Sequence, residues 1–120
     1  MERQSPLKIK SYDFAVRTIK LSKYLQKEKQ EYILAKQILR SGTAIGALIM
    51  EAEYAQSNAD YINKFSVSLK EANETSYWLS LLKDTDYISE EMYVGIHAEC
   101  KELIAMLVSA IKTLKLKDKR

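Results

Sequence analysis

The ten residues from Ser41 to Met50 carry no charge, although they lie in the middle of a segment with the composition of a long helix. A helix on the surface of a small bundle normally keeps one polar or charged face toward water. Three turns without a charged residue therefore predict burial on more than one side. Because a chain of 120 residues has few other elements to provide that cover, we expect the protein to self-associate.

The spacing of the apolar residues predicts an all-α protein with a single domain. The chain has three Gly and one Pro, and its apolar residues recur at the three- and four-residue intervals of amphipathic helices. We expect four helices at about residues 5–26, 31–55, 59–83 and 89–115, joined by short polar turns. Short links between long helices place neighbours antiparallel, so residues 1–120 are predicted to form one up-down-up-down four-helix bundle, assembling as a cyclic homo-oligomer.

The first predicted helix carries apolar residues on two opposite faces. One face holds a regular stripe of Ile9, Tyr12, Ala15, Val16 and Ile19. The opposite face holds Phe14, Leu21 and Leu25. We expect these three side chains to point outward, where they add to the apolar surface available for self-association.

Two neighbouring stripes run along the second predicted helix. The core stripe is Leu34, Ile38, Ser41, Ile45, Leu48, Ile49 and Ala52, and the stripe beside it is Ala35, Leu39, Gly42, Gly46 and Met50. A glycine inside a helix costs about 1 kcal/mol relative to alanine, so two of them four residues apart indicate the close approach of another backbone. The alternative is that both glycines are tolerated beside a bulky neighbour of the same chain.

The aromatic pair Tyr77 and Trp78 on the third predicted helix is a further candidate contact. It lies near Glu71, Glu74 and Asp84 in the sequence, so packing against a helix or another subunit is favoured over stacking on nucleic-acid bases. The candidate interface residues are Phe14, Leu21, Leu25, Leu39, Gly42, Gly46, Met50, Tyr77 and Trp78.

Charge is unevenly distributed along the chain. The net charge is +6 in residues 1–40, −7 in residues 41–111 and +4 in residues 112–120, which gives +3 in total. One interpretation is a solvated surface whose basic ends attract its acidic middle, and the other is a basic patch for RNA or DNA. The candidate nucleic-acid-binding residues are Arg3, Lys8, Lys10, Arg17, Lys20, Lys23, Lys115, Lys117, Lys119 and Arg120.

The sequence contains no recognisable pattern of catalytic or metal-binding residues. Val94 stands three residues before His97, where a di-iron bundle uses glutamate, and His97 with Cys100 supplies only two metal ligands. The i,i+3 pair Glu71 and Glu74 is typical of ion pairing on a helix surface. The chain also has no glycine-rich phosphate loop and no nucleophile elbow. We therefore expect no enzymatic activity, no cofactor and no metal ion.

The expected location is the cytoplasm. A lone Cys100 cannot form a disulfide framework, and the first residues have no apolar stretch of a secretory signal. No run reaches the roughly 18 apolar residues of a membrane span, so we expect no membrane partner.

Two stretches of the sequence resemble a known family. The first is RSGTAIGA at residues 40–47, continued by EA at 51–52, QS at 56–57 and DYINK at 60–64. The second is LKEANET at residues 69–75, followed by YWL at 77–79 and LL at 81–82. Together they resemble the bacterial four-helix-bundle family whose founding members are encoded in intervening sequences of the 23S ribosomal RNA gene. That origin explains the ribosomal-protein label of the family.

The resemblance implies a four-helix bundle that assembles as a homopentameric ring without enzymatic activity. It also implies kinship with the accessory protein of diversity-generating retroelements, which binds a reverse transcriptase and nucleic acid. This chain departs from the family pattern at Ala44, Leu48 and Met50, where apolar residues replace polar ones. Our first hypothesis is an oligomeric interaction or scaffold protein. The alternative is an RNA- or DNA-binding accessory protein, and a ribosome component ranks last.

Overall fold

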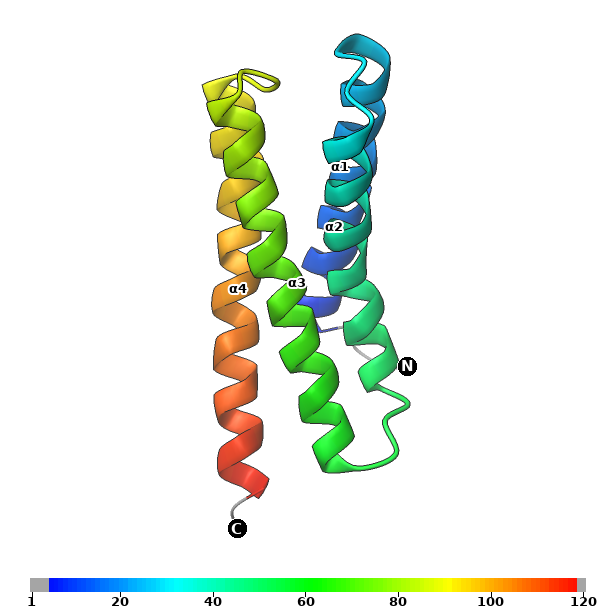
Figure 1. Cartoon of the computed structure of the whole chain (residues 1–120). Helices are drawn as coiled ribbons and strands as arrows, with labels where there is room; N and C mark the ends of the chain where they lie inside the picture. The colour runs from blue at the N-terminus through cyan, green and yellow to red at the C-terminus, as the bar shows by residue number, and fades with distance from the viewer. Residues whose placement is uncertain (1–4, 119–120) are drawn as a thin grey trace.

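The computed structural model describes residues 5–118 as four α-helices in an antiparallel bundle. They are α1 (Pro6–Glu28), α2 (Ile33–Ala52), α3 (Asn58–Asp84) and α4 (Glu90–Asp118). Consecutive helices run in opposite directions, with α1 beside α2 and α3 beside α4 (Figure 1). The prediction of an all-α up-down bundle is confirmed, although α2 ends earlier than predicted, at Ala52.

Serine side chains cap the starts of three of the helices. The hydroxyl of Ser5 accepts a hydrogen bond from the backbone N–H of Lys8, and Pro6 follows it at the first helical position. Ser57 caps α3 and Ser89 caps α4 in the same way. Each hydroxyl satisfies one of the N–H groups that a helix start leaves without a partner, so the starts are defined locally.

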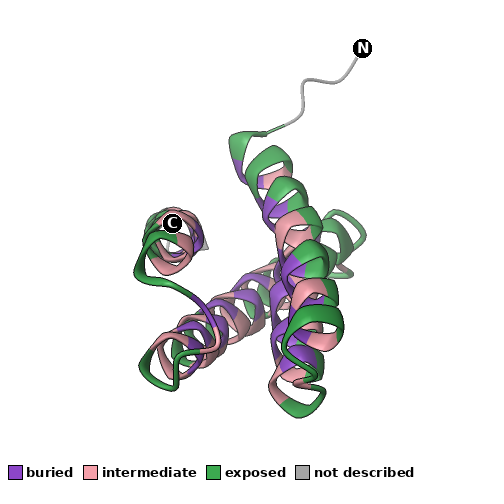
Figure 2. Ribbon diagram, turned by 90° about the horizontal axis from the view of Figure 1, so that it is seen from above, coloured by how far each residue is buried: buried purple, intermediate pink, exposed green. Residues whose placement is uncertain are grey.

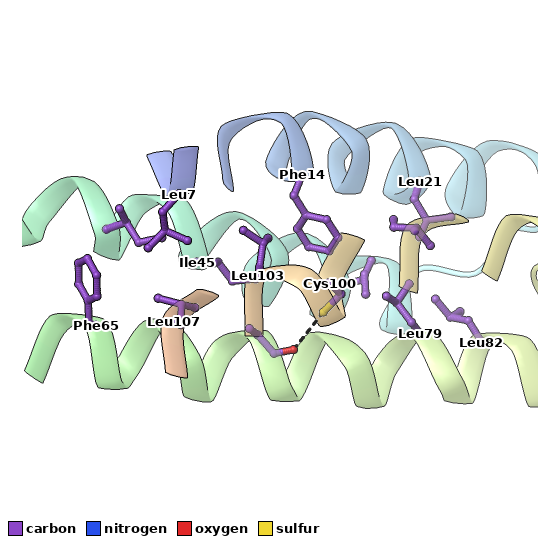
Figure 3. Close-up of a cluster of buried hydrophobic side chains, with 14 of the residues drawn as sticks. Leu7, Phe14, Leu21, Ile45, Phe65, Leu79, Leu82, Cys100, Leu103 and Leu107 are labelled. Carbon is purple, nitrogen blue, oxygen red and sulfur yellow. Dashed lines mark hydrogen bonds between the residues drawn. The ribbon is translucent and has the colours of Figure 1, made fainter. Parts of the chain in front are cut away.

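The inner face of α1 is the opposite of the one expected. Phe14 and Leu25 are completely buried and Leu21 is almost so, and all three belong to the core cluster. Figure 3 shows Phe14 and Leu21 pointing into the core. The exposed apolar residues of α1 are instead Ile9, Tyr12, Val16 and Ile19. The prediction that Phe14, Leu21 and Leu25 face outward and form an oligomer contact is therefore wrong.

The reason is a seven-residue repeat in α1 that combines large apolar and small polar residues. Leu7, Phe14 and Leu21 occupy one position of the repeat, and Ser11, Thr18 and Leu25 occupy the position four residues later. The buried hydroxyls bond to carbonyl oxygens, as in the 2.8 Å bond from Thr18 Oγ1 to Ala15. Small residues at core positions allow α1 to lie close to α2.

Gly42 and Gly46 form the other half of this close contact. A β-carbon on Gly42 would lie 2.6 Å from Thr18 Cγ2, and one on Gly46 would lie 3.3 Å from the backbone oxygen of Ser11. The close approach predicted from the two glycines exists, but its partner is α1 of the same chain. Gly42 is buried in this contact, so the prediction that it forms part of an oligomer interface is wrong.

Hydrogen bonds between helices repeat this pattern elsewhere in the bundle. Ser68 on α3 donates to the carbonyl of Ile45 on α2 at 2.9 Å, and the Cys100 thiol on α4 donates to the carbonyl of Ala72 on α3 at 3.3 Å. Burial raises the pKa of the Cys100 thiol to about 12, so this cysteine stays a neutral packing residue at physiological pH. Figure 2 shows the buried positions turned toward the neighbouring helices and the exposed ones on the outer faces.

Within residues 5–118, α2 is the one helix whose length and composition suit a membrane span. Core helices of bundles pass the same test, and seven of its residues are buried against its neighbours. This feature is weak evidence for a membrane location.

Candidate functional site

The most distinctive surface of the bundle is an exposed apolar area along α1. Ile9, Tyr12, Val16 and Ile19 follow one another at three- and four-residue spacing and are 37% to 69% exposed, Tyr12 the most. A groove of about 430 Å³ runs beside them between α1 and α2. Its lining residues are Lys8, Ser11, Tyr12, Ala15, Thr43, Gly46, Ala47 and Met50. We call Ile9, Tyr12, Val16 and Ile19 together with Met50 the α1–α2 apolar surface.

The remaining candidate interface residues do not form one surface. Met50 is exposed at the α1–α2 groove, whereas Leu39 is only partly exposed. Tyr77 and Trp78 lie on α3 in edge-to-face contact, with ring centroids 5.3 Å apart. Trp78 Nε1 is 3.4 Å from Glu74, whose carboxylate pairs with Arg40 of α2, so these aromatics belong to the α2–α3 side of the bundle.

Three of the candidate nucleic-acid-binding residues are held in ion pairs. Lys8 pairs with Glu53, Lys10 pairs with Glu102 at 3.0 Å, and Arg17 pairs with Glu99. The last two pairs join α1 to α4 and support the interpretation that the basic start of the chain attracts its acidic middle. A cation that already has a carboxylate partner offers less attraction to a phosphate, so these three contribute less than their charge suggests.

Other basic candidates stay exposed but are divided between the two ends of the bundle. Lys20 and Lys23 are exposed near the end of α1, while Lys115 and Lys117 lie at the end of α4, at the opposite end of the molecule (Figure 1). Arg3, Lys119 and Arg120 lie outside the described residues. The described candidates therefore form no single basic patch.

His97 lies at the boundary between the core and solvent, in a small polar cluster between α3 and α4. Its Nε2 is 2.9 Å from Ser76 Oγ, and the ring of Tyr93 stacks on it with centroids 4.6 Å apart. Partial burial lowers the pKa of His97 from its ordinary value near 6.5, and the nearby charges of Lys101 and Lys83 add to this effect. A neutral imidazole is therefore favoured. Among residues 5–118 no three His, Cys, Asp or Glu side chains are placed to hold a metal ion.

Met50 of the α1–α2 apolar surface is among the candidate interface residues predicted from the sequence, whereas the α1 residues of this surface are not. Ile9, Tyr12, Val16 and Ile19 form the more regular apolar stripe, which is the pattern expected of an inner face. The signal that identifies the true inner face is the seven-residue repeat of Leu7, Phe14 and Leu21 described above, because it persists over the whole helix.

Comparisons with known proteins agree with the resemblance read from the two sequence stretches. Residues 4–109 match the profile of the 23S rRNA-intervening sequence protein family. A crystal structure from Bacteroides thetaiotaomicron, described as a protein of unknown function from the S23 ribosomal protein family, has 55% sequence identity and a TM-score of 0.87. The match covers 88% of this chain and 98% of that one. No curated protein sequence matches significantly.

Proposed function

The chain belongs to the 23S rRNA-intervening sequence protein family, and we propose that it is a non-enzymatic scaffold protein that works as a cyclic homo-oligomer. The observation that carries this proposal is the α1–α2 apolar surface. Isolated apolar residues are common on protein surfaces, but these four recur on one helix face, and Tyr12 also lines the α1–α2 groove together with Met50. Exposed apolar residues gathered in this way are typical of protein contacts.

The dimensions of the subunit also favour assembly. Its accessible surface is 7687 Å², compared with about 6,600 Å² expected for a compact monomer of this mass. Its radius of gyration is 15.3 Å, compared with about 13.6 Å expected for a compact domain of this length. The bundle is elongated, with extents of 51 × 26 × 24 Å, so its long sides are available to neighbouring copies. A homopentamer, as the resemblance implies, is the assembly that we propose.

Placing a charge in the α1–α2 apolar surface is expected to separate the subunits. Tyr12→Glu puts a carboxylate where a neighbour excludes water, so the assembly should dissociate toward the 13.8 kDa monomer in light-scattering measurements at micromolar concentration. The matched control is Tyr77→Glu on α3, which lies diagonally across the bundle from α1 and should leave the mass unchanged. A wild-type protein that is monomeric under these conditions contradicts the proposed function.

The alternative function is binding of RNA or DNA through phosphate contacts. The observation that favours it is a row of exposed lysines on α1, Lys20, Lys23 and Lys27, for which no ion pair is found in the described part of the chain. Three cations at three- and four-residue spacing follow one side of a helix and can track a phosphate backbone. Repetition of the row in every copy of an oligomer would strengthen weak binding.

Reversing two charges of this row tests the alternative. Lys20→Glu/Lys23→Glu is expected to abolish binding of a labelled single strand or duplex, measured by fluorescence anisotropy at low salt. The control Lys70→Glu/Lys101→Glu changes the net charge equally at exposed positions elsewhere and should retain binding. Binding by the wild-type protein should weaken steeply between about 50 and 200 mM salt and show little sequence preference. No binding at low salt would exclude this function.

A further inference from the structure

We infer that the first two turns of α4 are held against α3 by a pH-sensitive latch, which is closed while His97 is neutral and loosens when His97 takes up a proton. The inference does not depend on the proposed self-association, because the latch lies within one subunit. The latch consists of Ser76, Ser80 and Lys83 on α3 and Glu90, Tyr93 and His97 on α4.

The contacts of the latch follow one another along the seam between α3 and α4. His97 Nε2 lies 2.9 Å from Ser76 Oγ, and the ring of Tyr93 stacks on the imidazole. One turn earlier on α4, the hydroxyl of Tyr93 lies 3.3 Å from Ser80 Oγ, and the ammonium of Lys83 lies 4.6 Å from the centroid of the Tyr93 ring. His97 is therefore linked through Tyr93 to the side chains that join the two helices near their connecting turn.

On its other side, the start of α4 borders a cavity. This cavity of about 320 Å³ lies between α1 and α4 and is lined at the α4 end by Ile88, Met92 and Ile96. In the part of the chain that the structure describes, the ion pairs between α1 and α4 involve Glu99 and Glu102, which both come after the first two turns. These turns therefore depend on their contacts with α3 more than the rest of α4 does.

Lys101 opposes protonation of His97 from within α4. It follows His97 by one turn, and like charges at this spacing repel each other. Lys101 is exposed and makes no ion pair within residues 5–118, so no carboxylate offsets its charge. The positions three and four residues from His97 also lack Asp and Glu, since they hold Tyr93, Val94, Cys100 and Lys101.

α3 contributes a second cation, Lys83. Its ammonium already lies against the ring of Tyr93, so a protonated His97 stacked on that ring adds another cation to the same ring. Asp84 and Glu90 lie 3.7 and 4.0 Å from Lys83, but both carboxylates are largely exposed, so water and salt screen them. Partial burial, followed by the two nearby lysine charges, lowers the pKa of His97.

Protonation of His97 therefore works against the latch. Because the fold favours the neutral imidazole, the stability that the latch contributes is complete above the ordinary histidine pKa of 6.5 and is lost as the pH falls below it. The Ser76 hydroxyl can donate to a neutral Nε2 or accept from a protonated one, so the added charge, and not the loss of this bond, loosens the latch. The first turns of α4 should then separate from α3.

The first test uses the fact that His97 is the only histidine in the sequence. His97→Gln keeps a polar side chain that can bond to Ser76 but does not titrate between pH 5 and 8. As the pH is lowered from about 7.5 to 5.5, the melting temperature of the wild type, measured by circular dichroism, should fall relative to that of His97→Gln. The carboxylates are the same in both proteins, so their titration cancels in this difference. A difference that stays constant with pH overturns the inference.

The second test reverses the charge beside the latch. Lys101→Glu places a carboxylate one turn after His97, where it stabilises the protonated imidazole. The pH at the midpoint of the His97 titration, measured by nuclear magnetic resonance, should therefore rise above that of the wild type. The control Lys112→Glu makes the same charge change at an exposed position four turns away and should leave the midpoint unchanged. Equal midpoints for Lys101→Glu and the wild type contradict the charge argument.

Hydrogen exchange shows whether the loosening is local. In the wild type, the backbone amides of residues 87–97 should lose protection, expressed as protection factors, at about pH 5.5 relative to pH 7.5. Amides in the middle of α2 and α3 should keep their protection, and His97→Gln should show no such change in residues 87–97. An equal loss along all four helices would mean that protonation destabilises the whole bundle, and the latch would then be excluded.

Discussion

Phe14→Ala is expected to lower the free energy of unfolding by about 3–5 kcal/mol, the largest effect of any substitution considered for this protein. Phe14 is completely buried and belongs to the same core cluster as Leu103, Cys100 and Leu79 (Figure 3). Truncation removes most of a large side chain and leaves a cavity that the surrounding core cannot fill completely. Chemical denaturation followed by circular dichroism measures the change.

Tyr12→Ala is the matched control, because it truncates an aromatic residue on the opposite face of the same helix. Tyr12 is 69% exposed, so the free energy of unfolding should change by no more than about 0.5 kcal/mol when both variants are compared at protein concentrations below assembly. Similar losses from both substitutions, or a larger loss from Tyr12→Ala, would mean that α1 presents its other face to the core.

Gly42→Ala is expected to destabilise the protein by about 1–3 kcal/mol even though alanine is the better helix former. The added methyl would lie 2.6 Å from Thr18 Cγ2 and within 3 Å of two further Thr18 atoms. Thr18 is buried and its hydroxyl is bonded to the Ala15 carbonyl, so a change of its rotamer would break a hydrogen bond inside the core. The strain has to be relieved by separating α1 from α2.

Gly95→Ala provides the comparison within the same chain. The nearest atoms that a methyl there would meet all belong to the guanidinium group of Arg17, with Nη2 closest at 2.7 Å, and this group is the far end of a flexible and partly exposed side chain. This variant should be as stable as the wild type or more stable by up to about 1 kcal/mol. In the double variant Thr18→Ala/Gly42→Ala, removal of the threonine methyl should reduce the cost of Gly42→Ala. Equal melting temperatures for Gly42→Ala and Gly95→Ala would contradict the close packing of α1 and α2.

The sequence by itself was sufficient to predict the number of helices, their order and their starts. Ser5, Ser57 and Ser89 cap helices through bonds to N–H groups three residues away, so the signal is complete within one turn. The core stripe of α2 was also predicted well, since Ile38, Ile45 and Ile49 are all buried. These properties depend on neighbours in the chain, which is why local patterns reveal them.

The same reasoning failed on α1 because this helix is apolar on both sides. The periodicity shows that α1 has two apolar faces, but it does not indicate which of them is buried. The stripe with the more regular spacing is the exposed one. The decision depends on shape. Gly42 and Gly46 of α2 leave room for Thr18 and Ser11 of α1, and the face of α1 that carries these two small residues is also the one that carries Phe14.

The tertiary structure also determines which charged side chains form ion pairs and which polar side chains lie within hydrogen-bond distance of one another. The pairing of Lys10 with Glu102 spans 92 positions in the chain, and the contact of Ser76 with His97 requires the register between α3 and α4. Helix propensity and local sequence patterns depend on residues a few positions apart, so they cannot predict contacts between residues this far apart in the chain. The sequence therefore determined the helices and their order, whereas the close packing of α1 on α2 determined which face of α1 stays exposed.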